Sequence, residues 1–79
     1  ILRFTADWCG PCKALAMNIT AAELDTPIEV IDIDKDTDAA VQYGIRGIPT
    51  MILVDENNEV KKRHTGVLSP TELKEWVNN

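Results

Sequence analysis

The only two cysteines of the chain, Cys9 and Cys12, stand in the hexapeptide DWCGPC between a strand-like and a helix-like stretch. Residues 1–5 form a short run that contains β-branched and aromatic side chains, which is typical of a strand. An apolar stripe at helical spacing follows the motif and comprises Cys12, Leu15, Ala16 and Ile19, and this helix is expected to end near Leu24. The Cβ atoms of two residues three apart on a first helical turn lie about 5–6 Å from each other. This separation is near what a disulfide requires. The pair can therefore open and close with little movement of the backbone.

The start of a helix activates a thiol. Its unpaired N–H groups and partial positive charge stabilise a thiolate, which is the form that attacks a disulfide. Cys9, at the very start, is expected to be exposed and to attack. Cys12, one turn further in and on the apolar stripe, is expected to be buried and to resolve the mixed disulfide. Pro11 costs no helical hydrogen bond at this position.

Three other uses of the cysteines fit less well. A tetrahedral zinc site needs four ligands, and only Cys9, Cys12 and His64 are suitable. A haem-attachment motif needs a histidine after the second cysteine, where Lys13 stands. A permanent disulfide that closes so short a loop stabilises little. Redox activity is therefore favoured, and no metal is expected.

Length and charge narrow the function further. With 79 residues, the chain is expected to form one domain, residues 1–79. A net charge of −5 argues against nucleic acid as a partner. No apolar run approaches the roughly 20 residues of a membrane helix, and no signal peptide is visible. We therefore expect a cytoplasmic protein without nucleic-acid or membrane partners.

The rest of the sequence predicts five further elements, which give the order βαβαββα. Its expected elements are a strand at 28–33, a short helix at 39–43, strands at 50–54 and 60–65, and a helix that begins after Ser69. Gly44 closes the short helix, and Ser69, Pro70 and Glu72 form a capping box with proline at the first helical position. The opening strand–helix–strand predicts a parallel pair, and the last two strands predict an antiparallel hairpin.

Three separated segments resemble the thioredoxin family: WCGPCK (8–13), YGIRGIPT (43–50) and GVLS (66–69). The resemblance implies an α/β protein with a minimal thioredoxin fold, in which three helices flank a four-stranded mixed sheet. It also implies a protein-disulfide reductase whose only redox group is the Cys9–Cys12 pair, with no cofactor. Its partners would be disulfide-containing target proteins and a thioredoxin reductase or similar electron donor, and the chain would be a monomer.

The resemblance also implies roles for other residues. Pro49 would be cis and lie against the cysteines, and Trp8, Gly10 and Pro11 would form the active-site loop. A docking surface around Cys9 would comprise Trp8, Gly47, Ile48, Pro49, Gly66 and Val67. Asp34 would stand where it can meet the indole of Trp8.

Two features depart from the family. The usual strand and helix ahead of the first strand have no counterpart in residues 1–79, so we expect a minimal version whose element order is similar to a glutaredoxin core. Arg3 stands where the family places a buried Asp behind the second cysteine, and Val30 replaces the usual lysine neighbour. Strand alternation puts Arg3 on one face with Ile1 and Thr5. Arg3 either reaches water or pairs with Asp32 or Asp34, or it lies close enough to the thiols to favour thiolate. The second arrangement would make the couple more oxidising.

Other functions stay open at this point. A glutaredoxin-like carrier reduced by glutathione is one alternative, and the reductant that restores the dithiol distinguishes it. A non-redox binding subunit is another, and it would keep its function without both cysteines. A third is an oxidase or isomerase of an oxidising compartment.

Overall fold

The computed structural model describes residues 1–79 and has the predicted element order. The elements are β1 (Leu2–Thr5), α1 (Gly10–Ala22), β2 (Glu29–Asp32), α2 (Thr37–Gln42), β3 (Thr50–Val54), β4 (Val60–Thr65) and α3 (Pro70–Asn78). The four strands form one mixed sheet in the order β2-β1-β3-β4. The predicted fold class is confirmed. None of the helices combines the length and hydrophobicity needed to cross a bilayer.

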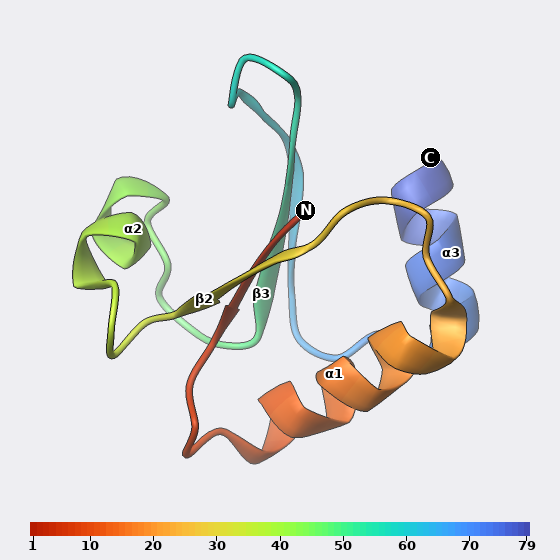
Figure 1. The fold of residues 1–79 in the computed structure, drawn as a ribbon, viewed down its shortest axis with the longest axis horizontal. Coiled ribbons are helices and arrows are strands. Elements are labelled where there is room, and N and C mark those ends of the chain that lie inside the picture. Colours follow the sequence, from red (N-terminus) through yellow and green to blue (C-terminus); the bar gives the residue numbers. More distant parts are fainter.

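Strand pairing follows the sequence prediction. β1 pairs in parallel with β2, and β3 and β4 form an antiparallel hairpin. The central strands β1 and β3 run antiparallel. As a result, the carboxyl ends of β1, β2 and β4 and the start of β3 all lie at one end of the sheet, the lower end in Figure 1. The loops that carry the three family motifs therefore meet there.

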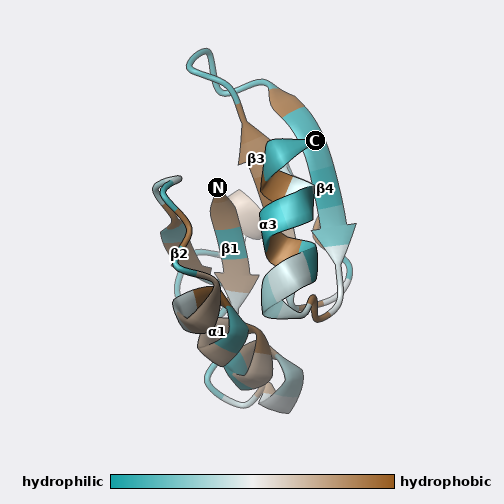
Figure 2. Cartoon of the chain, turned by 90° about the vertical axis from the view of Figure 1, so that its right-hand side faces the viewer, coloured by the Kyte–Doolittle hydropathy of each residue, from teal (hydrophilic) through white to brown (hydrophobic).

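Helices cover both faces of the sheet (Figure 1). α1 and α3 pack against one face, where the buried residues Ile1, Leu15, Ala22, Met51, Leu68 and Leu73 form the larger core cluster. α2 covers the other face, where Leu2, Phe4 and Ile52 are buried. Figure 2 shows the reason for this layering: the central strand β3 is almost entirely hydrophobic, whereas the edge strand β4 is mostly hydrophilic.

Local signals fix the ends of the helices. The capping box of α3 is present, with Ser69 and Glu72 hydrogen-bonded to each other's backbone N–H groups. α2 begins after the N-cap Asp36, and Gly44 follows with a φ of +63°. α1 ends at Ala22, slightly before the predicted Leu24, because Glu23 takes a left-handed conformation with a φ of 52°.

Candidate active site

Cys9 and Cys12 form a disulfide at the N-terminus of α1. Their Cα atoms are 5.2 Å apart. Cys9 is the N-cap of the helix, and its Sγ accepts a hydrogen bond of 3.1 Å from the backbone N–H of Cys12. After reduction, the same N–H and the positive end of the helix would stabilise a thiolate on Cys9.

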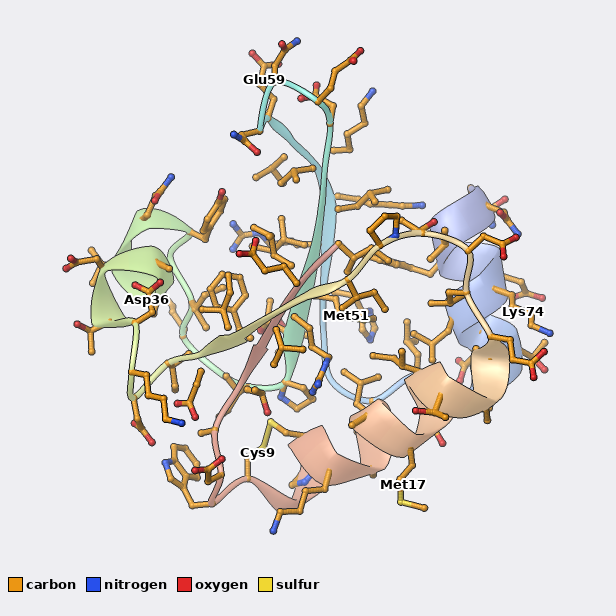
Figure 3. The ribbon with its side chains drawn as sticks, viewed as in Figure 1. Cys9, Met17, Asp36, Met51, Glu59 and Lys74 are labelled. Carbon is orange, nitrogen blue, oxygen red and sulfur yellow. A yellow bond between two sulfur atoms is a disulfide. The ribbon has the colours of Figure 1, made fainter.

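The expected exposure of Cys9 is wrong. In the disulfide form, Cys9 is 5% exposed and Cys12 is 1% exposed, and both belong to a small buried cluster with Ala6. Ile33 and Ile48, from two distant segments, pack against this cluster. This packing contributes to the burial of the disulfide. In Figure 3, Cys9 lies at the β1–α1 junction, at the lower end of the sheet.

The segment before β3 supplies a second part of the site. The Ile48–Pro49 peptide bond is cis, and Pro49 is buried. The carbonyl of Pro49 accepts a hydrogen bond of 2.9 Å from the N–H of Gly66, which follows β4. The backbone N–H and C=O of Ile48 make no hydrogen bond within the chain. Ile48 therefore keeps both backbone groups available beside Cys9.

Trp8 is an exposed part of the site and not a core residue. Its side chain is 69% exposed, and the indole N–H donates a 2.8 Å hydrogen bond to the carboxylate of Asp34. The parallel pairing of β1 and β2 explains this contact across 26 residues, because both strands deliver their following loops to the same edge. Asp34 thus fixes the orientation of the tryptophan next to Cys9.

An apolar groove of about 300 Å³ adjoins the disulfide. It is lined by Trp8, Ile33, Ala40, Ile45, Arg46, Gly47 and Ile48. Trp8, Gly47 and Ile48 were predicted for a docking surface, whereas the other four were not singled out. The sequence carries little local signal for these four residues, because the end of β2, α2 and the loop after α2 come together at the groove only in the tertiary fold.

Gly66 and Val67 do not line this groove. The N–H of Gly66 donates a hydrogen bond to the carbonyl of Pro49. Gly66 has a φ of +113°, a left-handed conformation that favours glycine. Val67 is 42% exposed. Gly10 and Pro11 are exposed on the first turn of α1. No group of three or more His, Cys, Asp or Glu residues could hold a metal ion.

Arg3 lies on the face of the sheet that α1 covers. β1 alternates between buried and half-buried residues, and Leu2 and Phe4 point to the α2 face. Arg3 lines an open pocket of about 470 Å³ together with Cys12. Of the alternatives for Arg3, pairing with Asp32 or Asp34 does not occur. Asp32 accepts from the N–H of Asp34, Asp34 accepts from the indole of Trp8, and neither carboxylate contacts the guanidinium.

Comparison with known proteins agrees with this geometry. The family model described as Thioredoxin matches residues 1–79. The chain belongs to the thioredoxin family. It is 39% identical to thioredoxin of Buchnera aphidicola subsp. Baizongia pistaciae over 99% of this chain and 74% of the relative. It is also 38% identical to thioredoxin of Rhodospirillum rubrum over 94% of this chain and 74% of the relative.

Solved thioredoxins share the fold. A mutant thioredoxin from Halobacterium salinarum superposes with a TM-score of 0.85 at 33% identity, over 98% of this chain and 69% of that one. The reduced thioredoxin pre-protein of Schistosoma mansoni gives a TM-score of 0.83 at 29% identity, over 98% of this chain and 73% of that one. With its Cys9–Cys12 pair, this thioredoxin-family chain is a thiol–disulfide oxidoreductase of the disulfide-reductase type.

Proposed function

We propose that the chain reduces the disulfides of other proteins, with Cys9 as the attacking thiol and Cys12 as the resolving thiol. The observation that carries this proposal is the hydrogen bond from the Cys12 N–H to the Cys9 Sγ at the helix N-terminus. It stabilises negative charge on Cys9. Cys9 is also the sulfur nearer the surface, since Cys12 is almost completely buried.

The reaction has two exchanges. The Cys9 thiolate attacks one sulfur of the target disulfide, so a mixed disulfide forms and the other target sulfur leaves as a thiolate. The Cys12 thiol then loses its proton and attacks the Cys9 Sγ. The Cys9–Cys12 disulfide forms, and the second target sulfur leaves as a thiolate. Two electrons pass to the target, whose two thiolates take up two protons.

The docking surface is proposed to hold an extended segment of the target across Cys9. Ile48 offers an unpaired backbone N–H and C=O, which can pair with an extended strand. Trp8 and the groove beside it offer apolar contact to the target's side chains. Gly47, cis-Pro49, Gly66 and Val67 complete this surface in the proposal. A surface that binds its target through backbone hydrogen bonds and a small apolar groove depends little on the target's sequence. We therefore expect it to accept many target proteins.

We further propose that residues 1–79 act as one monomeric thioredoxin-like domain in the cytoplasm. A thioredoxin reductase or similar donor would restore the dithiol, and no cofactor or nucleic acid would take part. Reduction of the oxidised chain by NADPH with a thioredoxin reductase, compared with reduced glutathione, tests the donor. Regeneration by glutathione alone would instead indicate a glutaredoxin-like carrier.

The roles of the two cysteines can be tested by trapping. Insulin serves as a model disulfide protein. The Cys12→Ser variant is expected to accumulate a covalent complex with insulin through Cys9, and the complex should disappear on addition of excess dithiol. The Cys9→Ser variant is the matched control and should form no such complex. If only the Cys9→Ser variant forms the complex, the assigned roles are reversed.

A further inference from the structure

The pocket beside Cys12 lies on the opposite face of β1 from the apolar groove. It is lined by Arg3, Thr5, Ala6, Asp7, Cys12, Lys13, Ala16 and Val30, which come from β1, the following loop, α1 and β2. Cys12 and Ala16 are four residues apart on α1 and therefore share the face of the helix above Arg3. The buried sulfur of the proposed resolving cysteine and a guanidinium thus border the same space.

The charged side chains around this pocket differ in how far they are exposed to solvent. Arg3 is half-buried, whereas Asp7 and Lys13 are exposed on the rim. Val30, from β2, adds no charge. Solvent screens the two rim charges, and their opposite signs partly cancel at Cys12. The positive charge of Arg3 is therefore the charge at this pocket that solvent screens least from Cys12.

Arg3 has no acidic partner that would neutralise its charge. No hydrogen bond or ion pair of the structure involves its guanidinium, and no buried side-chain nitrogen lacks a partner, so the group reaches solvent through the pocket. Partial burial lowers the pKa of Arg3 below its ordinary value. An arginine stays protonated despite such a shift.

We propose that the guanidinium of Arg3 stabilises the thiolate of Cys12 and thereby drives the step that resolves the mixed disulfide. This inference rests on the proposed role of Cys12 as the resolving thiol. The Cys12 proton passes to water in the pocket, so no carboxylate base is needed. The thiolate then attacks the Cys9 Sγ, and the target sulfur leaves with the electron pair. Arg3 is a positioning residue in this scheme, because it acts through the charge on Cys12.

The experiment measures the pKa of the Cys12 thiol in a Cys9→Ser background, where it is the only cysteine. The rate of alkylation by iodoacetamide is followed against pH. Arg3→Gln is expected to raise the Cys12 pKa by about one unit, the low end of the effect of a nearby opposite charge. Arg3→Lys keeps the charge and should restore most of the difference. Lys74→Gln makes the same change in net charge on α3, far from Cys9 in Figure 3, and should leave the pKa unchanged.

A kinetic readout separates this role from a structural one. With both cysteines present, Arg3→Gln should slow release of insulin from the mixed disulfide about three- to fourfold near neutral pH. The thiolate fraction falls about tenfold, and the higher nucleophilicity of the more basic thiolate offsets part of this loss. In the Cys12→Ser background, the same substitution should leave the rate of complex formation through Cys9 unchanged.

Two results would overturn the proposal. One is an equal Cys12 pKa with Arg3 and with Gln at this position. The other is a Cys12 pKa that Arg3→Lys raises as much as Arg3→Gln does, because Arg3→Lys keeps the positive charge that the proposal invokes. If the Cys12→Ser protein forms no complex with insulin, the proposed function fails, whereas the pKa comparison still decides the role of Arg3.

Discussion

Reduction of the Cys9–Cys12 disulfide should destabilise the folded chain by a modest, calculable amount. The disulfide joins residues separated by 3 in sequence, so it restricts the unfolded chain only slightly. For a loop of about four residues, the chain-entropy relation gives about 1.9 kcal/mol at 25 °C. In a chain of this size, each kcal/mol corresponds to about 4–8 °C, so the reduced form should melt about 8–15 °C below the oxidised form.

The assay is calorimetric unfolding of the oxidised chain and of the chain reduced with a phosphine. Thiolate stabilisation at the helix N-terminus would add to the stability of the reduced form, so both scans are run at about pH 5, where more of the thiol is protonated. The Cys9→Ser/Cys12→Ser double variant is the matched control. It should melt at one temperature with and without the phosphine.

The same difference must appear in the redox potential, because folding and reduction form a closed thermodynamic cycle. A free energy of about 1.9 kcal/mol converts to about 40 mV for a two-electron couple. The folded couple should therefore be about 40 mV more reducing than the same dithiol in the unfolded chain. A reduced form that melts at or above the oxidised form would refute the reasoning, since helix contacts to the thiols would then outweigh loop entropy.

Three further predictions concern the core, the tryptophan contact and acid stability. Leu73 is fully buried between α3 and the sheet, so Leu73→Ala should lower the free energy of unfolding by about 2–5 kcal/mol in urea titration; an unchanged midpoint would contradict the packing of α3. Asp34→Asn removes the carboxylate charge that accepts the Trp8 indole N–H, so the NMR signal of that N–H should shift while the exposed contact costs less than about 1 kcal/mol of stability; an unmoved signal would contradict the contact. Hydrogen bonds from Ser69 lower the pKa of Glu72, so its contribution to stability is complete above the unfolded pKa of about 4.3 and disappears as pH falls through the lower folded pKa. Glu72→Gln should therefore flatten this acid limb of stability against pH, and an identical limb in the variant would contradict the capping box.

Elements with strong local signals could be predicted from the sequence. The strands Thr50–Val54 and Val60–Thr65 have their predicted bounds, and the capping box of α3 follows from residues close in sequence. The left-handed Glu23 that ends α1 early has no comparable signal, because glutamate seldom takes this conformation. Local chemistry thus determines most ends of the elements, although not all.

The burial of Cys9 could not be predicted in this way. A position at the start of a helix indicates exposure only when nothing else in the chain covers it. Here Ile33 and Ile48 pack against the buried cluster that contains Cys9, and they reach it from the ends of different strands. The same reasoning explains why Ile45 and Arg46 were not predicted as groove residues. Their place depends on α2 packing against the sheet face opposite α1.

The alternation of β1 gives the site two separate environments. Ile48 and Trp8 border the groove beside Cys9, on the α2 side of the sheet, whereas Arg3 borders the pocket beside Cys12, on the α1 side. In the proposed mechanism, target binding and the acidity of the resolving thiol are therefore governed by different residues on opposite faces of one strand. A substitution in the groove should change which disulfides are reduced without changing the Cys12 pKa. A substitution of Arg3 should change the rate of resolution for all targets by the same factor, because the pocket beside Cys12 lies on the opposite face of β1 from the proposed docking groove.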